Sequence, residues 1–379
     1  MRAFLAAAVV FSLGCGALTA QPGRWTPAKA NAWYARQPWL VGANYSPANA
    51  INQLEFWQAD TFDPATIDKE LGWAAAIGMN TMRVYLHDLP WQQDAAGYRK
   101  RIDQFLGIAA KHGIRPMLVL FDSCWDPFPA LGKQRAPKPG VHNSGWVQGP
   151  GAKALADPSQ AARLEAYLKG VVGAFANDTR VLAWDVWNEP DNMNDPAYVK
   201  VEPRNKVDLV LPLLKQSFAW ARAAGATQPL TSGLWKSPDW SKLEKLTPLE
   251  RVQIEESDVI SFHNYEGADS FRARIVSLQG YKRPILCTEY MARGNNSTFE
   301  GSLPVALEYG VAAINWGLVQ GKTQTHLPWD SWRQAYTGGR EPKIWFHEVF
   351  RTDGAPYRPE ETKLIRMLTD KAKAKKKAG

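Results

Sequence analysis

Cysteine is scarce in this chain, with three residues among 379. Three are too few for the disulfide framework of a small secreted scaffold or for a four-cysteine zinc site. Cys124 and Cys287 lie in the body of the chain and could pair in an oxidising compartment, although nothing in their spacing favours a bridge. A hydrophobic core must therefore stabilise the fold, and 45% hydrophobic with 22% charged residues is a globular composition.

Long apolar segments are absent after the N-terminus, because no later stretch reaches the roughly 18 apolar residues of a membrane-spanning helix. The N-terminus itself holds a short, mostly apolar run, 3–13, behind Arg2, and mainly small residues follow up to Ala20. This layout is typical of a secretory signal peptide. We expect residues 1–20 to be cleaved and the protein to be exported to the periplasm or the medium. Cys15 leaves open a second interpretation, lipid anchoring as a bacterial lipoprotein.

The body of the chain lacks a strong excess of either charge. The formal net charge is +8, but six positive charges belong to Arg2 and to the five lysines at 371, 373, 375, 376 and 377. A nearly neutral body argues against a nucleic acid partner. We expect the lysine-rich tail, 369–379, to be a disordered and solvated chain end.

Short-period repeats and Ser/Gly linkers are also missing, so we expect one domain over residues 21–368. Short runs rich in β-branched and aromatic residues alternate with longer stretches of helical periodicity. A helical stretch follows every one of these runs except the fifth, where residues 242–253 are only a faint candidate for a helix. The eight candidate strands are 39–44, 81–86, 115–121, 181–187, 228–232, 258–264, 284–288 and 312–318.

Eight strands that alternate with helices predict an α/β fold, a (β/α)8 TIM barrel. The alternative is an open, doubly wound sheet, which would need a glycine-rich turn after the first strand. Residues 42–46, Gly-Ala-Asn-Tyr-Ser, do not fit such a turn. Two segments, 122–157 and 319–353, exceed ordinary loop length and follow the third and eighth strands. Barrel enzymes build their sites at this end of the strands.

Two glutamates stand at strand ends of the predicted barrel. Glu189 lies in the string Trp-Asp-Val-Trp-Asn-Glu-Pro at 184–190, and Glu289 lies in Pro-Ile-Leu-Cys-Thr-Glu-Tyr at 284–290. Glycoside hydrolysis requires two carboxyl groups, one protonated to serve the leaving oxygen and one ionised to attack the anomeric carbon or activate water. We therefore predict that the two side chains meet at one mouth of the barrel.

Both strings resemble motifs of clan A glycoside hydrolases, most of all glycoside hydrolase family 5 with its cellulase- and mannanase-like members. The likeness covers roughly residues 38–368. The Asn-Glu-Pro string is similar to the fourth-strand motif, which implies that Glu189 is the acid/base and that Asn188 binds the sugar 2-hydroxyl. The Thr-Glu-Tyr string is similar to the seventh-strand motif, which implies that Glu289 is the nucleophile of a retaining enzyme.

Three further motifs carry the resemblance. Arg83, in a Met-Arg-Val string, matches the second-strand arginine that holds the nucleophile. His263 and Tyr265 match the His-x-Tyr pair of the sixth strand. Trp316 matches the eighth-strand tryptophan beneath the reacting sugar.

These assignments imply opposite pKa shifts for the two glutamates. An opposite charge within about 4–6 Å lowers a carboxyl pKa, so Arg83 should keep Glu289 ionised. Desolvation between aromatic residues should raise the pKa of Glu189. The pair would then supply the acid and the base that the reaction needs.

The sequence departs from the family after the third strand, where a histidine pair or His-Asn is usual. Residues 121–125 are Phe-Asp-Ser-Cys-Trp instead. Asp122 is the candidate for the same subsite, and His87, after the second strand, is a candidate to compensate. The mismatch leaves open the accepted sugar and the choice between an outlying subfamily and a sister family.

Tryptophan is abundant, with 17 residues, and an indole N–H is costly to bury without a partner. We therefore expect many tryptophans to line a surface or cleft, where sugar rings stack on them. Lys322 is a candidate to bind an acidic sugar, although an ion pair with a loop carboxylate is the favoured interpretation. The loop tryptophans that follow strand ends are Trp125, Trp146, Trp235, Trp329 and Trp332.

Metal and cofactor motifs are missing, so we expect neither. The oxygen-rich run 191–195 is interpreted as a solvated loop rather than a calcium site. We predict a secreted, monomeric, retaining β-glycoside hydrolase whose partner is an oligo- or polysaccharide, and the long segments slightly favour exo action. Two alternatives stay open, a non-catalytic carbohydrate-binding barrel and a transglycosylase that uses the same two carboxylates.

Overall fold

The computed structural model describes residues 23–378 of the chain. The predicted signal peptide and the candidate lipoprotein cysteine lie outside the described residues. Within the described part, no helix combines the length and the apolar character that a membrane crossing requires.

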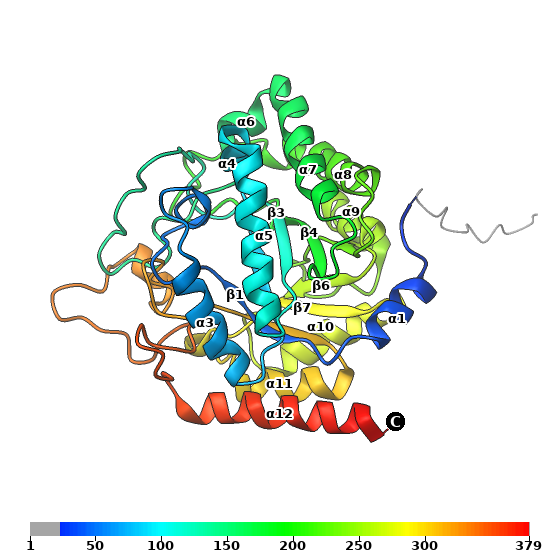
Figure 1. Cartoon of the computed structure of the whole chain (residues 1–379), viewed down its shortest axis with the longest axis vertical. Coiled ribbons are helices and arrows are strands. Elements are labelled where there is room, and N and C mark those ends of the chain that lie inside the picture. Colours follow the sequence, from blue (N-terminus) through cyan, green and yellow to red (C-terminus); the bar gives the residue numbers. More distant parts are fainter. Residues whose placement is uncertain (1–22, 379) are drawn as a thin grey trace, which may run out of the picture.

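Eight parallel strands form a nearly closed barrel at the centre of the molecule (Figure 1). The strands are β1 (Val41–Tyr45), β2 (Thr81–Tyr85), β3 (Met117–Asp122), β4 (Ala183–Asn188), β5 (Leu230–Thr231), β6 (Ile260–His263), β7 (Ile285–Glu289) and β8 (Ala312–Trp316). β1 pairs with both β2 and β8, and a parallel bridge from Leu234 to Phe262 brings the segment after β5 alongside β6. This order confirms the predicted (β/α)8 barrel and excludes the open doubly wound sheet.

Helices surround the barrel (Figure 1). The larger ones are α1 (Pro27–Ala35), α3 (Pro64–Ala76), α5 (Ala95–Lys111), α7 (Ala161–Ala174), α8 (Lys206–Ala223), α9 (Pro248–Glu256), α10 (Ala268–Gln279), α11 (Phe299–Tyr309) and α12 (Pro359–Ala378). The short ones are α2 (Gln53–Trp57), α4 (Asp88–Gln93), α6 (Ala152–Ala156) and the 3-10 turns η1 (Pro158–Gln160), η2 (Leu243–Lys245), η3 (Arg293–Asn295) and η4 (Trp329–Trp332).

α9 is the helix that was faint in the sequence between the fifth and sixth strands. Thr247 and Glu250 form a reciprocal capping box at its start. Leu249, Val252 and Ile254 are buried against the rest of the molecule. Nine residues are too few for helical periodicity to stand out, so the cap was the stronger signal.

The lysine-rich tail is helical, which corrects the expectation of a disordered chain end. α12 continues to Ala378 and lies beside α11 (Figure 1). The Nζ of Lys376 donates to the carbonyls of Ala35, Arg36 and Gln37, where α1 ends. A cation is favourable there because the last carbonyls of a helix lack intrahelical donors. Alanine and lysine also favour the helical state.

Several tryptophans lie in the core rather than in a cleft, against our expectation for many of them. Their indole N–H groups find partners inside the protein, which removes the cost of burial. Trp57 donates to the carbonyl of Tyr85 at 2.8 Å, and Trp187 donates to the hydroxyl of Ser123 at 2.9 Å. The four largest fully buried side chains are Trp57, Trp184, Trp187 and Trp240.

Two long segments with little regular structure lie at the C-terminal ends of the strands, 123–151 after β3 and 317–358 after β8. They hydrogen-bond to each other, for example from the amide of Asn143 to the carbonyl of Thr323 at 2.7 Å. Side chains of the second segment bond to the backbone of the first, from Ser331 to His142 and from Gln324 to Lys138. The two segments therefore act as one wall at the mouth of the barrel.

Gly42→Ala should destabilise the barrel. A Cβ at position 42 of β1 would stand 1.8 Å from the carbonyl oxygen of Thr81 in β2, and backbone atoms there cannot move aside without separating the strands. We expect the free energy of unfolding in urea to fall by about 1–3 kcal/mol, as for other overpacked sites. Gly107→Ala, on an exposed face of α5, is the matched control and should stabilise by about 0.5–1 kcal/mol. Wild-type stability in Gly42→Ala would contradict the close strand approach.

Candidate active site

Glu189 lies at the mouth of the barrel, directly after β4, and Pro190 turns the chain out of the strand. Its φ of 41° is in the left-handed region that non-glycine residues rarely adopt. Three groups hold its carboxylate: His263 Nδ1 lies 2.8 Å from Oε1, while Asn192 Nδ2 and Cys124 Sγ lie 2.7 and 3.4 Å from Oε2. Strained backbone persists only where the surroundings fix it, and these contacts do so.

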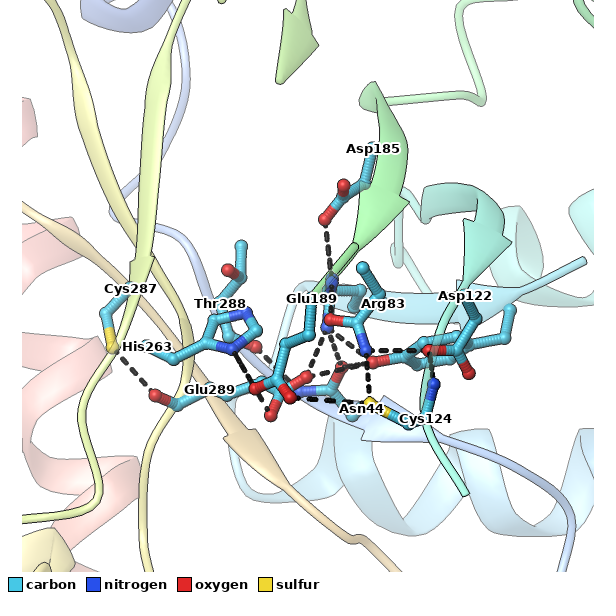
Figure 2. Close-up of polar contacts among 12 residues, drawn as sticks. Asn44, Arg83, Asp122, Cys124, Asp185, Glu189, His263, Cys287, Thr288 and Glu289 are labelled. Carbon is cyan, nitrogen blue, oxygen red and sulfur yellow. Dashed lines mark hydrogen bonds and ion pairs between the residues drawn. The ribbon is translucent and has the colours of Figure 1, made fainter. Parts of the chain in front are cut away.

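Aromatic residues share the pocket with Glu189, and they come from other segments rather than from its own strand. Trp125, Trp235 and Trp316 line the same pocket as Glu189. Trp184 and Trp187, which precede it in the chain, are fully buried in the core. Hydrogen bonds from His263 and its polar neighbours fix the orientation of the carboxyl group (Figure 2).

Glu289 is the last residue of β7, and both of its carboxylate oxygens accept hydrogen bonds (Figure 2). Arg83 Nη1 and the Tyr85 hydroxyl donate to Oε1 at 2.8 and 3.0 Å, and the Tyr265 hydroxyl donates to Oε2 at 2.7 Å. Burial alone would raise the pKa of Glu289. The charges of His263 and Arg83 and the Tyr265 hydrogen bond outweigh it and hold this pKa below its ordinary value.

Arg83 rises from β2 and is fully buried. Its Nε and Nη2 donate to Asp185 at 2.9 and 2.8 Å, and its Nη1 and Nη2 donate to the amide oxygens of Asn44 and Asn188 at 2.9 and 2.8 Å. The planar guanidinium thus links the carboxylates of Asp185 and Glu289. Sequence reasoning missed Asp185, although a carboxylate inside an otherwise apolar strand was a signal for a buried partner.

Glu189 and Glu289 face each other at short range. One oxygen of each and one nitrogen of His263 all lie within 4.8 Å of one another. His263 Nδ1 stands 2.8 Å from Glu189 and 3.6 Å from Glu289. The structure therefore brings the two predicted carboxylates and the predicted histidine into one site.

The same three side chains are the one set of potential metal ligands at such spacing in residues 23–378. Both oxygens of Glu289 already accept hydrogen bonds from Arg83 and Tyr265. A guanidinium beside the carboxylate repels a second cation. The donor set therefore suits two working carboxyl groups better than a bound ion.

A pocket of about 620 Å³ opens over the two carboxylates. Trp316 of β8 lines it, as the sequence predicted, and so does Trp235 after β5. Trp125 and Trp332 stack face to face in its wall, with ring centroids 5.3 Å apart. The residues that the two long segments contribute to the pocket are Cys124, Trp125, His142, Trp329, Trp332 and His347.

Asp122 is close to the site but does not line the pocket, which corrects its assignment as a sugar-binding residue. It accepts hydrogen bonds from Asn188 Nδ2 at 2.9 Å and from the indole of Trp146 at 2.6 Å. Burial raises its pKa to about 6, and these hydrogen bonds partly offset that effect. Asp122 therefore acts through Asn188, and Trp146 belongs to the packing behind the site.

His87 and Lys322 do not line this pocket either. His87 is fully buried, and its two ring nitrogens bond to the backbone of Leu89 and Gln148, at 3.1 and 2.9 Å. It caps α4 rather than compensating for the missing family histidine. Lys322 pairs with Glu55 at 2.6 Å, which is the favoured sequence interpretation.

The run 191–195 is part of the site and not a solvated loop. Asn192 binds Glu189, and Asn194 donates to the carbonyl of Ser123 at 2.9 Å. The fully buried Lys206 donates to the carbonyl of Asn192 at 2.6 Å and so fixes the loop from below. Asn192 and Asn194, shortly after the Asn-Glu-Pro string, were the signal in the sequence for this role.

Two histidines of the pocket wall were also missed. His142 Nδ1 bonds to the carbonyl of Leu327 at 2.7 Å, and His347 Nδ1 bonds to that of Met291 at 2.5 Å. Burial lowers the pKa of His142 to about 3 and that of His347 well below its ordinary value. Both rings are therefore neutral, and the Nε2 of His347 is a buried acceptor without a partner among the described residues.

The fold and the paired carboxylates are typical of the class of glycosidases built on a (β/α)8 barrel. The profile of the cellulase family, glycosyl hydrolase family 5, matches residues 44–333. The chain therefore belongs to glycoside hydrolase family 5.

Cys124 and Cys287 have free thiols, so no bridge joins them.

A curated relative, mannan endo-1,4-β-mannosidase A of Emericella nidulans, is 29% identical over 91 residues. That match covers 24% of this chain and 21% of the enzyme, so the chain spans about a fifth of that relative.

Solved structures share the fold at low identity. The exo-β-1,4-mannosidase Op5Man5 of Opitutaceae bacterium strain TAV5 has a TM-score of 0.57 and 17% identity, over 95% of this chain and 63% of that one. GH5_18 of Streptomyces cattleya, in complex with GlcNAc, has a TM-score of 0.57 and 14% identity, over 89% and 81%. The β-1,4-mannanase of the sea hare Aplysia kurodai has a TM-score of 0.52 and 15% identity, over 74% and 88%.

Tyr265→Phe should move the acid limb of the pH profile. Its hydroxyl donates to Glu289 and lowers the pKa of that carboxyl, so its loss raises the pKa and the ionised form disappears at higher pH. As pH falls, kcat/KM of the variant should drop about one pH unit earlier than that of the wild type. Tyr34→Phe removes a hydroxyl that bonds to the carbonyl of Gly310, away from the pocket, and should leave the profile unchanged. An unmoved acid limb in Tyr265→Phe would contradict this role.

Proposed function

We propose that the protein is a retaining β-glycosidase in which Glu289 is the nucleophile and Glu189 is the acid/base. The observation that carries the proposal is the approach of one oxygen of each carboxylate to within 4.8 Å. Retaining enzymes hold their carboxyl groups about 5–5.5 Å apart, whereas an inverting pair needs about 6.5–9.5 Å to admit a water.

The reaction has two steps. In the first, a Glu289 oxygen attacks the anomeric carbon while the bond from that carbon to the leaving oxygen breaks, and Glu189 gives its proton to the leaving oxygen. In the second, Glu189 takes a proton from a water whose oxygen attacks the same carbon and releases Glu289. The enzyme ends with Glu189 protonated and Glu289 ionised, as it began.

The neighbouring side chains suit these two steps. Arg83 and Tyr265 keep Glu289 ionised for attack. His263 Nδ1 lies within reach of both carboxylates and can follow the negative charge as it moves between them. Asn188 lines the pocket and is oriented by Asp122, which suits contact with the 2-hydroxyl.

We further propose exo action on a terminal sugar. The two long segments bond to each other and close one side of the pocket, which leaves room for a terminal unit rather than a through-running chain. Trp316 offers an apolar ring face for the sugar. His347 lines the same pocket with a neutral ring and adds a further aromatic face to this wall.

The sugar we propose is a β-linked mannose. The support comes from the relatives, which include a mannan endo-1,4-β-mannosidase, an exo-β-1,4-mannosidase and a GH5_18 protein whose structure holds Manβ1-4GlcNAc. Export from the cytoplasm belongs to the same proposal, because the N-terminal run of the sequence is typical of a signal peptide.

Glu289→Gln should reduce hydrolysis of aryl β-mannosides to background, because no covalent intermediate can form. Glu165→Gln, in an exposed ion pair on α7, is the matched control and should keep wild-type rates. A panel of aryl β-mannosides, β-glucosides and β-galactosides measures the activity, and NMR of the first-formed anomer measures retention. Wild-type rates in Glu289→Gln would contradict the nucleophile, and a first product of inverted configuration would contradict the mechanism.

Glu189→Ala should affect substrates according to their leaving group. Loss of proton donation costs about 10²–10⁴-fold where the leaving oxygen must be protonated, and much less where an activated phenol leaves. We expect kcat/KM to fall strongly on disaccharides and weakly on activated aryl glycosides. Equal losses on both would count against the acid role.

The same assays test the two alternatives from the sequence. Tight binding without hydrolysis across a broad glycan panel would indicate a carbohydrate-binding barrel. Glycosyl transfer that exceeds hydrolysis at high acceptor concentration would indicate a transglycosylase. Release of free sugar as the main product supports the proposed glycosidase.

A further inference from the structure

Arg274, on α10, lines the same pocket as the two carboxylates, and its guanidinium has no hydrogen-bond partner within residues 23–378. The residue is 9% exposed, and its Nη1 is fully buried without a hydrogen bond. Throughout residues 23–378, no oxygen accepts a hydrogen bond from its guanidinium and no carboxylate forms an ion pair with it. The ring of Trp240 lies 4.8 Å away and supports one face of the group.

A buried cation without a counter-ion is costly to the folded protein. Burial lowers the pKa of Arg274, and the more distant carboxylates of Glu266, Asp239 and Glu250 offset this only in part. Each of those carboxylates already accepts a hydrogen bond from a neighbouring serine, threonine or tryptophan. The guanidinium therefore keeps donors that no residue of the described chain uses.

The position of Arg274 relates it to the leaving group of the substrate. Glu189 must give its proton to the leaving oxygen, so the departing unit lies on the Glu189 side of the pocket. Asn192 bonds to Glu189 there, and Trp235 and Lys236 both bond to Asp191, one residue earlier in the same loop. Arg274 belongs to the lining that follows these segments, on α10 after β6. The terminal sugar instead faces Trp316 and the wall formed by the two long segments.

We propose that Arg274 binds a carboxylate on the unit next to the cleaved bond, so that the preferred substrate is a β-glycoside of an acidic sugar such as a hexuronic acid. This inference rests on the proposed function for the direction in which the substrate lies. A guanidinium edge presents two parallel N–H groups that match a carboxylate, and because Nη1 is buried the edge available here is that of Nε and Nη2. A substrate carboxylate would also supply the missing counter-ion and so offset the free-energy cost of burying the guanidinium.

Lys236 is placed to assist. Its Nζ pairs with Asp191 at 2.8 Å and lies 4.9 Å from the ring of Trp235, and the side chain is 44% exposed at the pocket. An ammonium has three donors, and Asp191 occupies two of them. One N–H therefore stays available to an anionic ligand.

The pocket also contains acidic side chains that limit the preference. Asp195 and Glu266 line it together with the two reacting carboxylates. Their repulsion favours one placement of a substrate carboxylate, beside Arg274 and Lys236, over others. We therefore expect a preference of about tenfold rather than absolute selectivity.

Two disaccharides test the proposal. Both carry the terminal sugar that the aryl panel identifies, β-1,4-linked either to glucuronic acid or to glucose, so that they differ in a carboxylate against a hydroxymethyl group. The wild-type enzyme should show a kcat/KM ratio of about ten or more in favour of the acidic compound. In Arg274→Gln this ratio should fall toward one, and in Lys236→Gln it should fall less.

Arg272→Gln is the matched control. It lies on the same helix, but its side chain pairs with Glu308 on the surface at 2.9 Å, so the variant should keep the wild-type ratio. Arg274→Lys retains the charge without the fork and should give an intermediate ratio. Thermal unfolding checks that Arg274→Gln is folded, and Arg274→Lys tests the role of the guanidinium if it is not.

The outcomes separate this inference from the proposed function. A wild-type ratio near one, or an unchanged ratio in Arg274→Gln, would overturn the role of Arg274 while aryl glycosides were still hydrolysed. If the enzyme hydrolysed none of the disaccharides and aryl glycosides, the proposed function itself would be overturned. If calorimetry showed that Glu289→Gln binds the acidic disaccharide but not the neutral one, the role of Arg274 would be supported independently of turnover.

Discussion

The buried guanidinium of Arg83 is the interaction on which the rest of the site depends. It rises from β2 and binds oxygens of Asn44 on β1, Asp185 on β4 and Glu289 on β7 (Figure 2). One side chain thereby ties together strands that lie far apart in the sequence. Loss of one partner from a buried charge pair costs about 3–5 kcal/mol, because the remaining charge stays uncompensated. The position and the ionised state of Glu289 follow from this constraint.

The barrel and the long segments have separate tasks. The strand ends supply the two carboxylates, Arg83 and His263, which define the chemistry. The segments 123–151 and 317–358 supply the pocket wall, and hydrogen bonds between them add to those that join each segment to the rest of the barrel. Changes in these segments can therefore alter the accepted substrate while the reaction stays the same.

The departure from the family after the third strand has a structural counterpart at Glu189. Residues 121–125 are Phe-Asp-Ser-Cys-Trp where a histidine pair or His-Asn is usual, and the thiol of Cys124 lies 3.4 Å from the carboxylate of Glu189. Asn192, held by the buried Lys206, makes the shorter contact at 2.7 Å. The amide of Asn192 and the thiol of Cys124 thus orient one oxygen of the carboxylate, while His263 contacts the other.

The sequence by itself determined the eight strands and the convergence of Glu189 and Glu289, because side chains at the ends of parallel strands must meet at one mouth. Through its likeness to family motifs, the sequence also predicted the placement of Arg83, His263, Tyr265 and Trp316. It did not determine which loop residues reach that mouth. His87 turned inward to cap α4, whereas His142 and His347 reached the pocket from the long segments, and Asp122 contacts Asn188 rather than the pocket. The tail is helical, and Lys376 donates hydrogen bonds to the free carbonyls at the end of α1. These outcomes depend on partners distant in the chain, and local periodicity carries no information about which distant segments will meet.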